Sequence, residues 1–327
     1  MKLVTFKAPD GDVRIGAIDE QGQLVDLTAS AAGSGRPDPE FASMQALIEA
    51  GDAGLERAEA LITSDHAVKW QPEDVEFLCP LPLPQQIRCF SAYEDHYKRV
   101  IEASLRARYG EWMVKLNRLF KFKRVPREFF DRPYYYKANR FCTAGPGAPI
   151  VAPENAVLID YEAELAVVIG KPGRNIEEDD AMDHVFGYTV YNDVTARGLL
   201  ARELSSPLHA GPAKGKDFDG SHIFGPVIVT ADEMEDPYCR KITVRVNGEV
   251  RGEGDTDGLT HSVAELIAYA SQGETLQPGE VLGTGACEWG TGFEAGRFPR
   301  AGDVIEIEID GIGVLANPLS GLQISQA

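Results

Sequence analysis

Two glutamates at alternate positions introduce an otherwise apolar run of the chain. Glu162 and Glu164 stand just before the segment LAVVIG, residues 165–170. In an extended strand, residues two apart point to the same face, so the two carboxylates would project side by side. The apolar run indicates a strand covered on both faces, where paired negative charges repel each other and lose hydration unless a cation lies between them. A hard divalent ion with oxygen ligands meets that need, whereas the same pair on a solvent-exposed edge strand would carry no chemistry.

A second predicted strand, over residues 185–192, ends in a polar cluster about thirty residues later. Asp193 follows this strand directly, and Arg197 comes four residues further on. Asp193 would complete a site of three carboxylates, with water or substrate in the remaining positions. An N-cap formed by Asn192 or Asp193 at the start of a helix is an alternative that is compatible with metal binding.

The elements that must position these residues indicate a strand-rich α+β chain. Three short strand patterns separated by turn residues occupy the first 30 residues, and an apolar helical face follows over residues 44–61. The Pro-rich run at 79–84 reads as a boundary, so we expect a small N-terminal α+β unit over 1–78 and a main domain over 79–327. The main domain lacks the regular βαβ alternation of a doubly wound sheet. Its expected strands cover 157–169, 185–192, 223–229, 242–246, 281–284 and 304–309, and its clear helix covers 260–271, where Ser262 and Glu265 have capping-box spacing.

Composition disfavours several classes of function. The net charge of -19 disfavours binding to nucleic acid or to an anionic membrane surface. No run approaches the ~20 apolar residues that span a bilayer, and the N-terminus reaches charged residues too soon for a signal peptide, so we expect a cytoplasmic protein. The 5 cysteines are widely spaced without a Cys-x-x-Cys pair, which argues against a disulfide framework or a thiolate zinc site.

One segment departs from the acidic character of the chain. Residues 96–130 are expected to be helical, and residues 98–140 contain thirteen Lys or Arg against four Asp or Glu. A solvated helix face is the simplest interpretation. A cap over an anionic pocket and an interface with an acidic surface of another subunit are the alternatives.

The motifs taken together resemble the fumarylacetoacetate hydrolase family. The resemblance rests on an ordered set: DYEAE at 160–164, YNDVTAR at 191–197, GKDFD at 215–219 and GTG at 283–285. It covers residues from about 85 to 320, and the set is far more specific than any single motif. It implies a mixed β-roll fold, Mg²⁺ or Mn²⁺ in the site and usually a homodimer.

The resemblance also implies roles for individual residues. Glu162, Glu164 and Asp193 match the metal-binding carboxylates, and Lys216 matches an active-site lysine. Arg197 matches an arginine that lines or braces the pocket. Thr284 matches a position that contacts the substrate carboxylate, and we include the neighbouring Gly285 in the substrate-binding set, although a plain turn explains the glycines equally well.

His96 is the candidate general base, because residues 87–96 resemble the family's strand followed by Tyr-x-x-His. An ordinary pKa of ~6.5 suits histidine to this task, and the other five histidines (66, 184, 209, 222 and 261) match no catalytic position of the family. The chain departs from the family pattern at Arg99, where smaller members have a Glu, at Cys89, where larger members have a fourth metal carboxylate, and at Leu200, where the pattern has a Gln. The acidic partner of His96 is therefore open among Glu94, Glu102, Glu288 and Glu294.

These residues imply hydrolysis of a carbon–carbon bond in a small anionic 1,3-diketo acid of the acylpyruvate or fumarylpyruvate type. His96 would activate water, and Lys216 would stabilise the oxyanion. A lyase or isomerase on the same scaffold is the main alternative, for example a 2-oxo-acid hydratase, an oxaloacetate decarboxylase or a hydroxymuconate-type isomerase, because a fold does not fix a reaction. A non-catalytic binding protein stabilised by metal is the third possibility.

Overall fold

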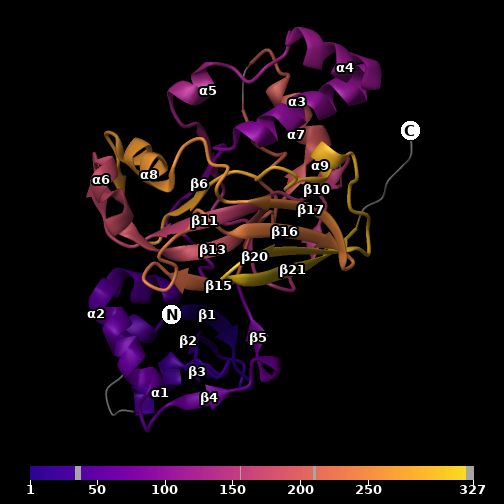
Figure 1. The fold of residues 1–327 in the computed structure, drawn as a ribbon. Coiled ribbons are helices and arrows are strands. Elements are labelled where there is room, and N and C mark those ends of the chain that lie inside the picture. The colour runs from indigo at the N-terminus through magenta and orange to yellow at the C-terminus, as the bar shows by residue number, and fades with distance from the viewer. Residues whose placement is uncertain (34–37, 155, 209–210, 322–327) are drawn as a thin grey trace.

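The computed structural model describes residues 1–33, 38–154, 156–208 and 211–321. His209 therefore lies outside the described residues. In the described segments the chain builds two large sheets with helices around them (Figure 1). The strand-rich α+β architecture expected from the sequence is confirmed.

The larger sheet runs through most of the molecule. Its strands along the main path are ordered β4-β3-β2-β1-β15-β13-β11-β19-β6-β7, while β5 pairs with β1 and β8 pairs with β15. The bounds of these strands are β1 (Lys2–Lys7), β2 (Val13–Ile18), β3 (Leu24–Asp26), β4 (Val68–Trp70), β5 (Glu76–Phe77), β6 (Ile87–Phe90), β7 (Tyr135–Ala138), β8 (Thr143–Ala144), β11 (Ala163–Ile169), β13 (Val185–Asp193), β15 (His222–Thr230) and β19 (Val281–Gly283).

The N-terminal strands extend this same sheet. Strand β1 pairs antiparallel with β15, with Lys2 opposite Val229 and Leu3 opposite Ile228. Figure 1 shows these strands at the opposite end of the molecule from α3 and α4. The division of the chain at residue 78 stays a prediction.

A second sheet packs against one face of the larger one. Val244 and Ile307 of the second sheet share a buried apolar cluster with Val190 and Val229 of the first, as in a rolled sheet. Its order is β17 (Glu249–Asp255), β16 (Lys241–Val246), β20 (Val304–Ile309), β21 (Gly313–Ser320) and β9 (Ile150–Val151). The sequence patterns did not predict β17 or β21. Two short pairs complete the strands: β10 (Ile159–Asp160) with β14 (Thr195–Ala196), and β12 (Gly173–Arg174) with β18 (Thr275–Leu276).

Strand β11 is covered on both faces, as its apolar run predicted. Leu165 and Val167 belong to the cluster between the two sheets. Ala166 and Val168 pack on the other side, in a cluster that includes residues of the N-terminal unit such as Leu47. All residues of the strand are buried. This burial excludes a solvent-exposed edge for Glu164, within the strand, and for Glu162, just before it.

Helices cover the sheets and the ends of the molecule. Helix α2 lies beside the N-terminal strands, and α3, α4 and α5 form a layer over the opposite end (Figure 1). Helix α8 begins one turn later than expected, but its capping box is confirmed: Ser262 Oγ accepts from Glu265 N at 3.1 Å, and Glu265 Oε2 accepts from Ser262 N at 2.6 Å. The bounds are α1 (Leu27–Gly33), α2 (Met44–Ile62), α3 (Glu94–Tyr109), α4 (Glu111–Phe120), α5 (Glu128–Asp131), α6 (Glu178–Ala181), α7 (Arg197–Leu204), α8 (Val263–Ser271) and α9 (Gly292–Ala295).

The basic segment over residues 98–140 contains most of α3, all of α4 and α5, and strand β7. Arg118 of α4 makes two hydrogen bonds of 2.7 Å to the Glu102 carboxylate of α3, which joins the two helices. In the part of the chain that the structure describes, no helix is long and apolar enough to cross a membrane.

Candidate active site

The three predicted metal carboxylates come together at one end of strands β11 and β13. Glu162 lies just before β11, Glu164 is its second residue, and Asp193 ends β13. The antiparallel register places Ala163 opposite Asn192, and Asp193 N donates to Glu162 O at 3.1 Å. One ligand oxygen from each of the three carboxylates lies within 4.8 Å of the other two. The strand alternation therefore produces the carboxylate cluster that the spacing predicted.

Burial makes it costly for all three carboxylates of this cluster to be ionised together. Glu162 is 9% exposed, and Glu164 and Asp193 are each 1% exposed. Burial, together with the negative charges of Asp193 and Glu162, raises the pKa of Glu164 well above its ordinary value. Burial opposes ionisation of Glu162 and Asp193 as well, but nearby positive charges, Lys216 foremost, hold the pKa of both below the ordinary value.

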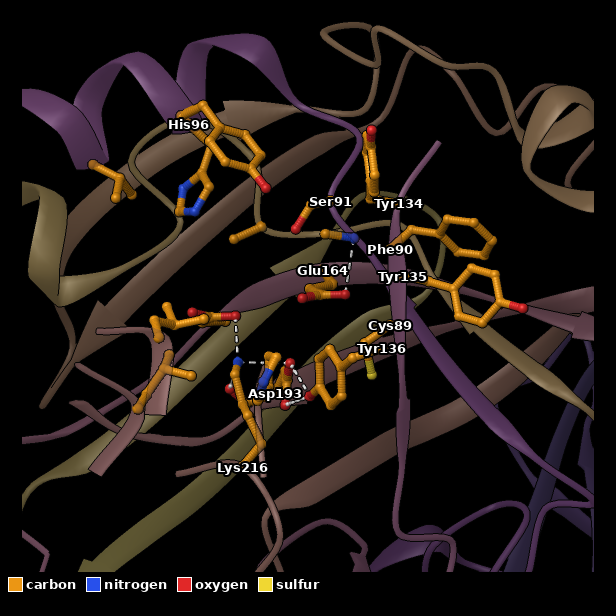
Figure 2. Close-up of a pocket in the computed structure, with 18 of the residues that line it drawn as sticks. Cys89, Phe90, Ser91, His96, Tyr134, Tyr135, Tyr136, Glu164, Asp193 and Lys216 are labelled. Carbon is orange, nitrogen blue, oxygen red and sulfur yellow. Dashed lines mark hydrogen bonds and ion pairs between the residues drawn. The ribbon is translucent and has the colours of Figure 1, made fainter. Parts of the chain in front are cut away.

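Lys216 supplies one of those positive charges from inside the cluster. Its Nζ lies 2.7 Å from Glu162 Oε2 and 2.7 Å from Asp193 Oδ2 (Figure 2). The preceding residue, Gly215, packs so closely on α7 that a Cβ would lie 2.5 Å from Leu200 N. Burial by itself would lower the pKa of Lys216, but Asp193 and Glu162 raise it, so the side chain is an ammonium ion.

Arg197 braces the cluster from the other side. Its Nη1 donates to Glu162 Oε1 at 2.6 Å, and its Nε donates to Asp160 Oδ2 at 2.8 Å. Asp160 is fully buried and also accepts from the backbone N–H groups of Gly292 and Phe293, at 2.8 and 2.9 Å. Asp160 is part of the DYEAE motif, but the sequence did not show that it anchors Arg197.

His96 lies across the pocket on the first turn of α3. Its Nδ1 is 3.3 Å from Glu294 Oε1, without hydrogen-bond alignment. Glu294 is 2% exposed and also caps the N-terminus of α9 with Thr291. Of the four acids left open by the sequence, Glu294 is thus the one beside His96, whereas Glu288 accepts from Arg99 Nε at 2.8 Å.

Two further residues hold Asp193, and sequence reasoning missed both. Tyr136 Oη donates to Asp193 Oδ1 and Oδ2 at 2.9 and 2.7 Å. His222 Nδ1 lies 3.5 Å from Asp193 Oδ1 and 2.7 Å from Tyr191 Oη. Tyr136 and His222 lie 57 and 29 residues away from Asp193 in the chain, and no local spacing pattern marks either of them.

Cys89, Asp193 and His222 form a second close group of metal-ligand residue types. However, Tyr191 Oη lies 3.2 Å from Cys89 Sγ and 2.7 Å from His222 Nδ1. The hydroxyl thus occupies the space between the two side chains, so this group supports Asp193 rather than a second metal site.

The GTG motif at 283–285 contributes a backbone N–H group, rather than a side chain, to the pocket. Gly285 N donates to Glu164 Oε2 at 2.9 Å, and Gly285 lines the pocket with a φ of 95°, which favours glycine. The Thr284 hydroxyl is fully buried and donates to Leu165 O at 3.0 Å. The structure therefore brings Gly285, but not the Thr284 side chain, to the pocket wall.

The pocket above the carboxylates has a volume of about 330 Å³. Figure 2 shows His96 on one side of it, Ser91 above Glu164, and Lys216 beside Asp193 at the floor. Seven of the eight predicted site residues line it, Thr284 being the exception: His96, Glu162, Glu164, Asp193, Arg197, Lys216 and Gly285.

Comparison with known proteins identifies the family. Residues 89–320 match the family described as fumarylacetoacetate (FAA) hydrolase C-terminal. The chain belongs to the fumarylacetoacetate hydrolase family. The match begins at β6 and ends with β21, so it contains the carboxylates, Lys216 and His96.

Three similar proteins are named oxaloacetate tautomerases. The chain is 34% identical over 325 residues to "Oxaloacetate tautomerase fahd2, mitochondrial" from Xenopus laevis, covering 98% of this chain and 90% of that protein. It is 33% identical over 324 residues to the human "Oxaloacetate tautomerase FAHD2B, mitochondrial", covering 97% and 91%. Over 191 residues, 58% of this chain and 62% of the other, it is 40% identical to "Oxaloacetate tautomerase YisK" from Bacillus subtilis.

Solved structures of the family share the fold. Fumarylacetoacetate hydrolase from Exiguobacterium antarcticum superposes with a TM-score of 0.72 at 30% identity, over 98% of this chain and 100% of that one. Maleylpyruvate hydrolase from Sphingobium sp. SYK-6, in complex with manganese(II) and pyruvate, gives a TM-score of 0.71 at 26% identity, covering 99% and 100%. The β-roll fold implied by the resemblance is thus confirmed.

The donor set of this family member fits a divalent cation. Asp160, Glu162, Glu164 and Asp193 carry four formal negative charges, which Arg197 and Lys216 reduce by two. A buried excess of two negative charges is costly unless a cation or protons offset it. Carboxylate oxygens favour hard ions such as Mg²⁺ and Mn²⁺, so the group of Glu162, Glu164 and Asp193 fits a divalent metal ion, while the choice of metal stays a prediction.

Proposed function

We propose that this protein is a divalent-metal-dependent tautomerase that interconverts the enol and keto forms of a small 2-oxo acid related to oxaloacetate. The relatives that match nearly the whole of this chain are named tautomerases. Their names favour an isomerase reaction over the hydrolysis of a carbon–carbon bond. The observation that carries the proposal is one pocket in which a buried carboxylate cluster faces His96.

Tautomerisation of the enol removes a proton from the oxygen on C2 and adds a proton at C3, the next carbon. It consumes no water. Glu162, Glu164 and Asp193 would hold the metal, which supplies Lewis-acid polarisation of the substrate oxygens. The Lys216 ammonium would stabilise negative charge on the substrate oxygen, because a fixed charge in a buried site needs no reorganisation. His96 would deliver the proton to carbon or remove it, and Glu294 would hold the imidazole ring in place.

Hydrolysis of an acylpyruvate is the second candidate. The His96–Glu294 pair is equally suited to activating a water molecule, and a solved relative is named a maleylpyruvate hydrolase. Homodimerisation and the cytoplasmic location stay predictions, and several relatives are named as mitochondrial.

Two parallel assays separate these candidates. One follows the loss of ultraviolet absorbance of enol oxaloacetate, and the other follows pyruvate released from acetylpyruvate, each with Mg²⁺, Mn²⁺ or EDTA. We expect metal-dependent enol loss well above the spontaneous rate, reduced about 10²–10⁴-fold by His96→Ala, and no pyruvate release. Enol loss that EDTA and His96→Ala leave unchanged would refute the proposal, and pyruvate release without enol conversion would favour the hydrolase.

A further inference from the structure

The pocket has a charged floor and an apolar outer wall. The floor carries the carboxylates and Lys216, where the oxo-acid head of the substrate would lie. Four apolar residues also line the pocket and make up its apolar wall: Val100 of α3, Leu200 and Leu204 of α7, and Pro212. Leu200 is half-buried, and its backbone packs directly against Gly215 beside Lys216. Helix α7 therefore fixes the position of Leu200 next to the catalytic lysine.

The cations of the pocket are already paired with protein carboxylates. Lys216 is shared between Glu162 and Asp193, and Arg197 is shared between Asp160 and Glu162. Among the described lining residues, the remaining basic side chain is His96, which faces Glu294.

Two basic residues on the N-terminal half of α3 are paired as well. Lys98 contacts Glu94 and Asp95, and Arg99 contacts Glu288 and stacks on the Trp289 ring. A charged group at the far end of the substrate would thus find no uncommitted Lys or Arg among the described lining residues.

The remaining lining side chains are neutral. They include the hydroxyls of Ser91, Tyr97 and Tyr134 and the side chains of the apolar wall. Neutral hydrogen bonds are roughly half as strong as charge-assisted ones, and a carboxylate placed against leucine loses hydration without compensation. An alkyl or aryl group, in contrast, gains free energy by covering the same wall.

We propose that the outer half of this pocket selects 2-oxo acids that carry an uncharged apolar substituent, alkyl or aryl, next to the 2-oxo group, and that Leu200 is the specificity-determining residue. The inference rests on the proposed function for the reaction but concerns the substrate class. It places a monocarboxylic acid such as phenylpyruvate ahead of a dicarboxylic acid such as oxaloacetate.

The test compares the enols of phenylpyruvate and oxaloacetate with the metal-loaded wild-type protein, the Leu200→Gln variant and the Leu208→Gln variant. Glutamine has about the size of leucine but offers a polar end to the second carboxylate. Leu208 is 87% exposed and does not line the pocket, so Leu208→Gln is the matched control.

We expect the wild type to favour phenylpyruvate in kcat/KM by about 10-fold or more, the range that apolar pocket contacts supply. Leu200→Gln should reduce or invert this ratio, and Leu208→Gln should preserve it. A wild-type preference for oxaloacetate, or a ratio that Leu200→Gln leaves unchanged, would overturn the inference while leaving the tautomerase proposal standing.

Calorimetric binding of the two acids to Mn²⁺-loaded His96→Ala protein provides a readout that does not depend on turnover. Tighter binding of phenylpyruvate than of oxaloacetate, weakened when Leu200→Gln is added, supports the inference. This holds even if neither enol is converted, and in that case only the proposed function fails. Equal or tighter binding of oxaloacetate overturns it.

Discussion

At the scale of single residues, Lys216 is the side chain most closely coupled to the carboxylates. It neutralises part of the cluster in the absence of metal, at 2.7 Å from both Glu162 and Asp193. A bound dication and this ammonium would repel each other. By this account Lys216 would weaken the binding of metal and at the same time stabilise charge on the substrate.

Replacing Lys216 by methionine should separate these two effects. We expect Lys216→Met to bind Mn²⁺ more tightly than the wild type, because a positive charge leaves the site, and to lose about 10²–10³-fold in kcat. Calorimetric Mn²⁺ titration and the enol assay measure the two quantities. Weaker Mn²⁺ binding would contradict this account of Lys216.

Tyr136 lines the pocket and contacts Asp193. Its hydroxyl donates to both carboxylate oxygens of Asp193, so Tyr136→Phe leaves a buried charge short of a donor. We expect a loss of about 1–3 kcal/mol in the free energy of unfolding without metal and a 10–100-fold loss in Mn²⁺ affinity. Urea denaturation measures the free energy of unfolding, and metal titration measures the Mn²⁺ affinity. The control is Tyr134→Phe, because Tyr134 lines the same pocket but is 39% exposed. Unchanged Mn²⁺ affinity in Tyr136→Phe would show that the hydroxyl does not position Asp193.

At the scale of elements, short polar motifs decide where helices begin. Helix α8 starts at Val263 because Ser262 and Glu265 satisfy each other's backbone N–H groups. The same device starts α9, where Thr291 and Glu294 form a capping box. In α9 the capping glutamate also faces His96, so one carboxylate serves both the helix and the candidate base.

The capping box of α8 offers a test of element stability that does not touch the pocket. Ser262→Ala should lower the free energy of unfolding by about 1 kcal/mol without changing kcat/KM in the enol assay. Ser262→Thr, which keeps the hydroxyl, should stay close to the wild type. A loss of activity in Ser262→Ala at full folding would show that α8 influences the pocket.

At the scale of the whole molecule, metal binding should stabilise the fold because the carboxylate cluster joins β11 to β13. Ligand binding to the native state adds about 2.7 kcal/mol at a free concentration 100 times Kd. For a chain of 327 residues we expect Mn²⁺ to raise Tm by roughly 4 °C, measured by calorimetry. Glu164→Gln removes a ligand and a buried negative charge, so it should abolish most of this rise without lowering Tm in EDTA. An Mn²⁺ effect equal to that of the wild type would place the metal elsewhere.

Acid sensitivity should include a contribution from the buried Arg88, which is 1% exposed. Its Nη2 donates to Glu274 Oε1 at 2.9 Å and its Nε to Glu280 Oε2 at 3.0 Å, which ties β6 to the segment before β19. The Arg88 contact lowers the pKa of Glu274 below its ordinary 4.5. The native state therefore favours the ionised form, and this stability is present above about pH 4.5 and lost as pH falls through the native pKa.

Because Glu274 is partly exposed, the contribution should be no more than about 1 kcal/mol. Urea denaturation at about pH 7 and pH 4 should show a smaller pH effect in Glu274→Gln than in the wild type. Identical pH dependence in the two proteins would exclude this ion pair as a source of acid sensitivity.

Local patterns in the sequence were sufficient for several features. Alternation placed Glu162 and Glu164 on one side of a strand, the apolar run after them predicted burial on both faces, and the spacing of Ser262 and Glu265 predicted a capped helix. These features depend on backbone periodicity, which repeats over two to four residues and can be read directly from the chain.

Only the tertiary structure decided which distant groups meet. It selected Glu294 as the acid beside His96, although the two are 198 residues apart by their numbers. It also brought Tyr136 to Asp193, turned the Thr284 hydroxyl toward Leu165, and joined the N-terminal strands to the main sheet through β1 and β15. Such contacts depend on strand order and on the packing of one sheet against another, which no spacing within a single segment encodes.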